Sequence, residues 1–141
     1  MGGRSDGRFR INQQQMQFYG TLSLENNGGF ASVRSRGTNL GLKKGDSIVA
    51  RVRGDGRQYS MNLYVPRGFG RYSFRQSFKT NKGQWSEVTL PIDTFVATYR
   101  GRVFSKEKLN PAQVNGLGIL LGDKQAGPFM LEIEWVKVRS N

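Results

Sequence analysis

Residues 116–136 read Gly116-Leu-Gly-Ile-Leu-Leu-Gly-Asp123-Lys-Gln-Ala-Gly-Pro-Phe129-Met-Leu-Glu-Ile-Glu-Trp-Val136. Two apolar runs are joined here by a turn that contains Gly127-Pro128, which can continue neither a helix nor a strand ladder. The second run alternates Phe129, Leu131 and Ile133 with Met130, Glu132 and Glu134, the period of a strand with one buried face. Val136 and Val138 reverse this alternation, so we expect a β-bulge near Trp135.

The same two-residue period predicts further strands upstream, at 16–24, 30–36, 47–53, 58–65, 72–78 and 85–92. Asn26-Asn-Gly-Gly29 and Gly54-Asp-Gly56 separate some of them, and the second has the composition of a hairpin turn, so strands 47–53 and 58–65 are expected to pair. Helix is limited to short turns, with Asn110-Pro111 as a helix start. Each strand has one polar face, which favours antiparallel sheets over a parallel α/β sheet. Roughly nine or ten short strands predict an all-β fold, a β-sandwich or a barrel.

Length and composition favour one domain. The chain has 141 residues, near the commonest domain size, and no repeat or change of composition divides it. No apolar run approaches the ~18 residues of a membrane helix, and no hydrophobic segment follows Met1. We therefore expect a single domain over residues 1–141, without a membrane span, and a cytoplasmic location is favoured.

The residue types that are missing exclude several kinds of chemistry. The sequence contains no His and no Cys, which rules out Ser-His-Asp and Cys-His nucleophiles and the usual zinc ligand sets. We expect no metal site and no cofactor. Glu132 and Glu134 lie two apart on one strand and so face the same way, as carboxylates do in some β-sandwich glycosidases. Because no third polar group supports them, they are better explained as the solvent side of the strand, and we predict no catalytic residue.

The charge of the chain is strongly positive. Lys and Arg number 22 against 10 Asp and Glu, a formal charge of +12, which attracts polyanions without specificity. The segment Arg67-Gly-Phe-Gly-Arg-Tyr-Ser-Phe74 resembles the first motif of the RNA recognition fold, but a Gly-rich turn that leads into a strand explains it better. Nucleic-acid binding through the basic surface stays an alternative, beside an ordinary solvated surface.

Several segments together carry a family resemblance. Met1-Gly-Gly-Arg-Ser5, Asn26-Asn-Gly-Gly-Phe-Ala-Ser-Val-Arg34, Gly54-Asp-Gly-Arg-Gln-Tyr59 and the stretch 116–136 resemble the complex I intermediate-associated protein family. The resemblance implies an antiparallel β-sandwich, a jelly roll similar to galactose-binding domains and related to carbohydrate-binding modules. It also implies that the family's first strand is missing here. Either the sequence is truncated, or its start is displaced, or the sandwich has an exposed edge that invites pairing with another chain, including a second copy.

The resemblance further implies a role in which a protein partner is held during assembly of a respiratory complex. A carbohydrate-binding module is the first alternative and nucleic-acid binding the second. For any of them we expect a donor-rich face with an aromatic platform on the central strands, formed by the outward residues of the predicted segments. The predicted ligand-binding residues are Arg51, Arg53, Gln58, Asn62, Tyr64 and Arg75.

Overall fold

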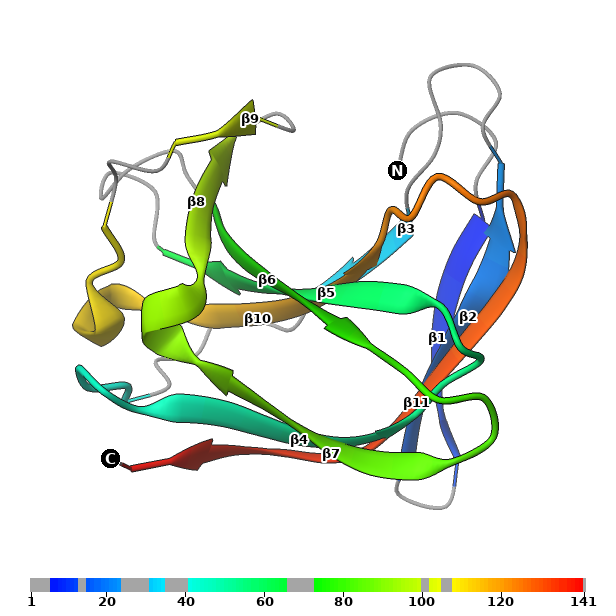
Figure 1. The fold of residues 1–141 in the computed structure, drawn as a ribbon, viewed down its shortest axis with the longest axis horizontal. Coiled ribbons are helices and arrows are strands. Elements are labelled where there is room, and N and C mark those ends of the chain that lie inside the picture. Colours follow the sequence, from blue (N-terminus) through cyan, green and yellow to red (C-terminus); the bar gives the residue numbers. More distant parts are fainter. Residues whose placement is uncertain are drawn as a thin grey trace.

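Alternating apolar residues build a sandwich of antiparallel sheets in the computed structural model, which describes residues 6–12, 15–23, 31–34, 41–65, 73–99, 102–104 and 108–140 (Figure 1). Sheet A has the strand order β1 (Asp6–Asn12), β2 (Gln15–Leu22), β11 (Gly127–Arg139), β4 (Ser47–Arg53) and β7 (Trp85–Pro91). Sheet B has the order β3 (Ala31–Arg34), β10 (Gly116–Leu121), β5 (Gln58–Tyr64), β6 (Ser73–Lys79), β8 (Val96–Tyr99) and β9 (Arg102–Val103). The described residues also include the short 3-10 helices η1 (Ile92–Thr94) and η2 (Pro111–Gln113). The predicted all-β sandwich is confirmed.

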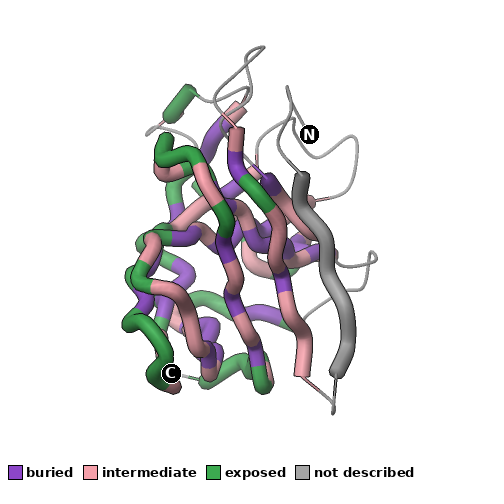
Figure 2. Tube along the Cα trace, turned by 90° about the vertical axis from the view of Figure 1, so that its right-hand side faces the viewer, coloured by how far each residue is buried: buried purple, intermediate pink, exposed green. Residues whose placement is uncertain are grey.

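The core lies between the sheets and follows the predicted alternation. Figure 2 shows buried residues alternating with half-buried and exposed ones along the strands. Phe18 of β2 packs edge-on against Phe129 of β11, with ring centroids 4.9 Å apart, and edge-on against Tyr59 of β5 across the sandwich at 6.4 Å. These residues share the core with the other inward-facing residues of the central strands, namely Ile48, Ala50, Val52, Met61, Leu63, Ile119, Leu121, Leu131 and Ile133. Burial of this apolar surface is the main stabilising contribution to the fold.

The turn at Gly54-Asp-Gly56 does not form the expected hairpin. β4 belongs to sheet A and β5 to sheet B, so the chain crosses here from one layer to the other. Gly54 makes an isolated parallel bridge with Lys82, and a Cβ atom at Gly54 would lie 2.2 Å from the Cβ of Thr80. The Thr80 hydroxyl donates to the Arg57 carbonyl (2.7 Å). A close contact with Thr80 therefore fixes the crossover, and short-range turn composition cannot reveal that contact.

The final strand contains the predicted bulge. Its pairing with β4 shifts register between Ile133 and Trp135, as the reversed alternation indicates. The preceding turn lies slightly earlier than expected, because Gly127 and Pro128 already belong to β11 and pair with β2. A proline close to a strand start is an accepted position.

The local helix signal at Asn110-Pro111 is also confirmed. Pro111 opens η2, and the Asn110 side chain accepts a hydrogen bond from the Ala112 backbone N–H (3.2 Å). The predicted turn at 26–29 and most of the RNA-motif resemblance at 67–74 lie outside the described residues. Of that motif, Phe74 is described, and it is buried in the core, where it cannot stack on a base.

Candidate functional site

The six predicted binding residues do not share one face. Arg51 and Arg53 lie on β4 and point outward from sheet A, whereas the other four lie on strands of sheet B, Gln58, Asn62 and Tyr64 on β5 and Arg75 on β6. The expectation of a single continuous surface is therefore wrong. Its physical reason is the crossover at Gly54, which sends two adjacent segments of sequence to opposite sides of the molecule.

On sheet A the two arginines are already paired with carboxylates. Arg53 donates through Nε to Glu132 Oε1 (2.8 Å), and its NH2 lies 2.7 Å from the same oxygen. Gln17 donates to the other oxygen of Glu132 at 3.2 Å. The Arg53 guanidinium also lies over the Trp85 ring, 4.9 Å from its centroid. The register places Trp85, Arg53, Glu132 and Gln17 opposite one another across four strands, so this face is a ladder that is satisfied internally.

The second carboxylate is held in the same way. Arg51 donates to Glu134 Oε2 at 3.3 Å, and its guanidinium lies 5.6 Å from the Trp85 ring centroid. Both glutamates therefore lie on the outer side of the last strand, as expected, and each binds an arginine there, with 40% of the Glu134 side chain exposed but only 12% of the Glu132 side chain. The positive charge of these two arginines is compensated locally, which makes the part of sheet A around Trp85 a poor site for an added anion.

On sheet B, Asn62, Tyr64 and Arg75 form a connected cluster. Asn62 lies opposite Arg75 in the register and accepts a hydrogen bond from Arg75 Nε at 3.0 Å. Its amide nitrogen donates in turn to the Tyr64 hydroxyl at 3.2 Å. Asn62 is only 3% exposed although it lies on the outer face, because its two neighbours cover it. We call these three residues the sheet B cluster.

The Tyr64 ring is seated against the neighbouring strand β10. A Cβ atom at Gly118 would lie 2.9 Å from Tyr64 Cε2 and 3.0 Å from its hydroxyl oxygen, so only glycine leaves room for the ring. Tyr64 is half-buried in this position. The missing side chain at Gly118 thus lets the aromatic ring lie across the sheet beside the Asn62 amide.

Arg75 is the charged member of the cluster. Burial lowers the pKa of its guanidinium, an effect that nearby Tyr64 partly opposes. In the described part of the chain no carboxylate forms an ion pair with Arg75. Half-buried arginine is usually paired with an acid, because desolvation of an unpaired charge is costly. The arrangement favours a ligand that supplies a carboxylate or several hydrogen-bond acceptors.

Gln58 lies apart from the cluster. It occupies the first position of β5, opposite Lys79, and is exposed. It lines a shallow surface cavity of about 510 Å³ together with Arg57 and Asp123. Of the six predicted residues, Asn62, Tyr64 and Arg75 are therefore brought together and the other three are not.

Sequence reasoning missed a network of hydrogen bonds that Arg57 makes beside that cavity. Arg57 binds Asp123 in a bidentate manner, Nε to Oδ2 at 2.8 Å and NH2 to Oδ1 at 2.7 Å, and also donates to the carbonyl oxygens of Gln125, Gly127 and Pro128. The hydrogen bond from Arg57 lowers the pKa of the Asp123 carboxyl. These hydrogen bonds connect the crossover between β4 and β5 to the turn before β11 and to the first residues of that strand. Arg57 and Asp123 are 66 residues apart, and no local pattern links them.

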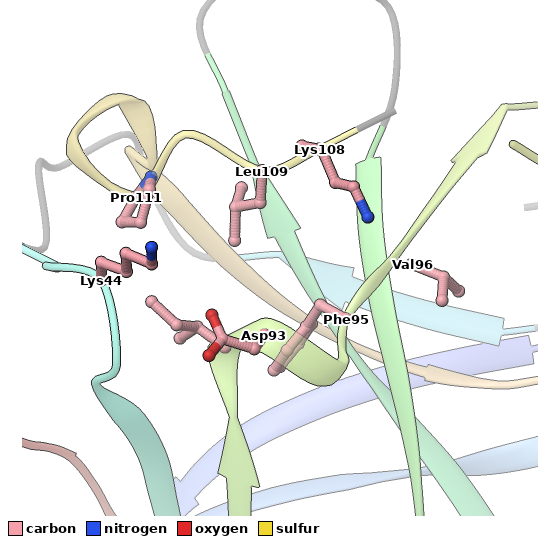
Figure 3. A pocket seen from close by; sticks show the side chains of 8 residues that line it. Lys44, Asp93, Phe95, Val96, Lys108, Leu109 and Pro111 are labelled. Atoms are coloured by element: carbon pink, nitrogen blue, oxygen red, sulfur yellow. The ribbon is translucent and has the colours of Figure 1, made fainter. Parts of the chain in front are cut away.

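A second cavity lies beside η1 and measures about 530 Å³ (Figure 3). Its apolar lining comes from η1 and the two residues after it and from the start of η2 with the segment before it, and Lys44, Asp93 and Lys108 contribute polar atoms. Because two lysines and one aspartate line this cavity, its charge favours neither an anionic nor a cationic ligand clearly. Among the described residues no group of three or more acidic, His or Cys side chains could hold a metal ion, and no helix is long and apolar enough to cross a membrane.

The two-sheet architecture is the β-sandwich fold that is also found in solved structures of carbohydrate-binding modules. A family 11 carbohydrate-binding module from Clostridium thermocellum, in complex with a β-1,3-1,4-mixed-linked tetrasaccharide, superimposes with a TM-score of 0.72 at 11% identity, over 94% of this chain and 84% of that chain. A family 30 module from a cellulosomal cellulase of the same organism gives 0.70 at 9% identity, over 100% and 90%. At such identity the likeness concerns the fold alone.

The sequence comparison is more specific. The family model of complex I intermediate-associated protein 30 matches residues 1–133, and the chain belongs to this family. The mitochondrial complex I intermediate-associated protein 30 of Mus musculus is 29% identical over 161 residues, 98% of this chain and 49% of the relative. A Caenorhabditis elegans protein, named as a probable mitochondrial complex I intermediate-associated protein 30, is 31% identical over 96 residues, 64% of this chain and 28% of the relative. The chain thus spans about half the length, or less, of these curated relatives.

Proposed function

We propose that this chain is a non-enzymatic binding module that holds a protein partner during the assembly of respiratory complex I, the process for which its relatives are named. The observation that carries the proposal is the sheet B cluster. It presents a half-buried guanidinium that lacks a carboxylate partner among the described residues, next to a seated tyrosine ring. Arginine and tyrosine are enriched among residues that dominate protein interfaces.

A partner's acidic side chain would complete the cluster. A carboxylate placed beside Arg75 would gain a charge-assisted hydrogen bond in a site that is already partly desolvated. Tyr64 would add apolar contact area at little entropic cost, because its ring is already held by Gly118 and Asn62. The cluster is therefore preorganised for a protein surface that presents an acid beside an apolar patch.

The absence of catalysis is part of this proposal. Glu132 and Glu134 are the carboxylate pair that could act on a glycoside, and each is bound to an arginine. Each carboxylate is thus already engaged by a guanidinium and is not free to donate a proton to a glycosidic oxygen. We expect purified protein to release no product from aryl glycosides, with or without Glu132→Gln.

The proposal is tested by affinity capture from mitochondrial lysate, with bound proteins identified at low and high salt. Arg75→Gln removes the charge but keeps a donor for Asn62, and Arg51→Gln makes the same change on sheet A, where the arginine is already paired. Complex I subunits should be retained by the parent and by Arg51→Gln, and lost by Arg75→Gln. Equal capture by both variants, or no complex I subunit on the parent protein, would overturn the proposal.

Carbohydrate binding is a second candidate, and the seated Tyr64 ring favours it. Sugars bind through a flat aromatic ring against their C–H faces and through donors to their hydroxyl groups, and Tyr64 has Asn62 and Arg75 beside it. The test is thermal stabilisation by a β-1,3-1,4-mixed-linked tetrasaccharide. A sugar site should respond to Tyr64→Ala much more than to Tyr64→Phe, because the ring makes the contact. No stabilisation of the parent protein by this and related oligosaccharides would exclude it.

The cellular compartment belongs to the same proposal. The curated relatives are named as mitochondrial proteins, whereas the sequence of this chain favours the cytoplasm, and that expectation stays a prediction. Fractionation of cells that express the tagged protein from its own gene distinguishes the two. A mitochondrial location agrees with a role in complex I assembly.

A further inference from the structure

The last strand of sheet A extends beyond its neighbour. β11 pairs with β2 from Gly127 to Ile133, and the register ends there because β2 begins at Gln15, next to its hairpin with β1. On the opposite side β11 remains paired with β4 as far as Arg139. Figure 1 shows β11 passing the β1–β2 pair and running on to the C-terminus. Among the described residues nothing pairs with residues 135–139 on the β2 side, which leaves an open sheet edge.

The inner side of this edge is apolar and uncovered. Val136 lies opposite Ala50 and Val138 opposite Ile48, and residues opposite each other in an antiparallel pair share a face. Ala50 and Ile48 are buried in the core, so the two valines lie on the core side of sheet A. They are nevertheless 37% and 42% exposed. A further strand at this edge would cover them.

The outer side of the same edge is cationic. Trp135, Lys137 and Arg139 alternate with the valines, and the Lys137 ammonium lies 4.3 Å from the centroid of the Trp135 ring. In the described part of the chain no carboxylate forms an ion pair with Lys137 or Arg139. A strand laid against this edge would therefore meet two cations on one face and two valines on the other.

We propose that residues 135–139 form a docking edge for an extended segment of a partner protein in which apolar residues alternate with acidic ones. Such a segment would complete the backbone hydrogen bonds of the edge, place its apolar side chains on Val136 and Val138, and place its carboxylates beside Lys137 and Arg139. A second copy of this chain is the wrong occupant. It would bring two more cations to the same ladder, and each copy carries a formal charge of +12.

This edge is independent of the sheet B cluster. It lies on sheet A, and its proposed ligand is recognised mainly through the backbone, whereas Arg75 recognises a side chain. The two proposals can therefore fail separately, and Arg75→Gln serves as a control that should leave binding at the edge unchanged.

The test uses a capped peptide in which Glu and Val alternate, titrated onto the full chain and followed by amide hydrogen exchange of residues 134–140. We expect exchange in this segment to slow on binding. A peptide with alternating Lys and Val, and one with the same composition as the first but with its Glu residues in a block, should give little protection. Unchanged exchange at saturating alternating Glu–Val peptide would overturn the proposal, as would equal protection by the Lys–Val peptide.

Two variants locate the interaction. Lys137→Glu should lower the affinity for the Glu–Val peptide by roughly three- to tenfold, since a favourable cross-strand charge pair becomes a repulsive one. Lys79→Glu, the control, makes the same charge change on sheet B and should leave the affinity unchanged. Val136→Asp should abolish binding, and a thermal melt of this variant checks that it is folded. If the parent protein dimerises and Val136→Asp abolishes the dimer, the occupant of the edge is a second copy, and the proposal is overturned.

Discussion

Gly118 positions an aromatic ring by having no side chain. A Cβ atom there would meet Tyr64 Cε2 and the Val33 carbonyl oxygen, each at 2.9 Å, and the backbone oxygen cannot move aside. We expect Gly118→Ala to lower the free energy of unfolding by about 1 to 3 kcal/mol, the usual cost of overpacking, as measured by denaturant titration. Ser60→Ala, a small change on the adjacent strand β5, is the control and should cost much less. An unchanged midpoint for Gly118→Ala would show that the ring does not lie against β10.

Tyr59 predicts how stability depends on alkaline pH. Its ring is fully buried and its hydroxyl donates to both carboxylate oxygens of Asp55 (3.1 Å each). Burial raises the pKa of Tyr59 well above its usual range, and the charge of Asp55 adds to the effect. The neutral phenol is thus favoured in the folded state. Its contribution is complete below the ordinary pKa of about 10, and is lost as the pH rises above that value, by up to ~1.4 kcal/mol per pH unit.

The measurement is the free energy of unfolding between about pH 9 and 11.5. Tyr59→Phe removes the titrating group while it keeps the ring, so its stability should fall less steeply than that of the parent protein over this range. Parallel curves for the two proteins would mean that other groups, such as the lysines, account for the alkaline loss.

The two halves of β11 differ in their role at the scale of a strand. Ile133 lies in the core before the bulge, whereas Val138 lies after it at the open edge. Ile133→Ala should lower the free energy of unfolding by about 2 to 5 kcal/mol, because it leaves a cavity between the sheets. Val138→Ala should cost well under half as much, since its side chain is 42% exposed. Equal shifts in the denaturation midpoint would contradict the assigned strand phase.

The strands and their faces could be predicted because they depend on neighbours in the sequence. The alternation of Ile48, Ala50 and Val52 identifies β4 and its buried side without knowledge of the rest of the chain. The bulge near Trp135 is visible for the same reason, as a change of phase within one strand. Local pattern is sufficient wherever one strand face is buried.

The candidate site could be predicted only in part, because it depends on which sheet each strand joins. Gly54-Asp-Gly56 fits both a hairpin and a crossover, and the contact with Thr80 that decides between them lies far along the chain. Asn62, Tyr64 and Arg75 remain together because β5 and β6 are neighbours in sequence and in space. The sequence predicts Arg51 and Arg53 on the same surface because no local signal in it distinguishes the crossover from a hairpin.

At the scale of the whole molecule, the formal charge of +12 has to be separated from specific recognition. Diffuse charge binds polyanions by counterion release, which weakens steeply with salt, whereas a desolvated guanidinium that meets a carboxylate in a packed interface is screened much less. We expect a poly-uridine RNA to bind at low salt and to be released near physiological ionic strength. Complex I subunits captured through Arg75 should remain bound under the same conditions.

The arginine variants make this prediction specific. Arg51→Gln and Arg75→Gln each remove one charge, so they should reduce RNA affinity at low salt by similar small factors. Only Arg75→Gln should reduce capture of the protein partner, because Arg51 is already bound to Glu134. RNA binding that persists at high salt and depends on Arg75 far more than on Arg51 would instead identify the sheet B cluster as a nucleic-acid site. Charge on the whole surface would then explain the encounter with RNA, and the half-buried Arg75 guanidinium would explain its retention.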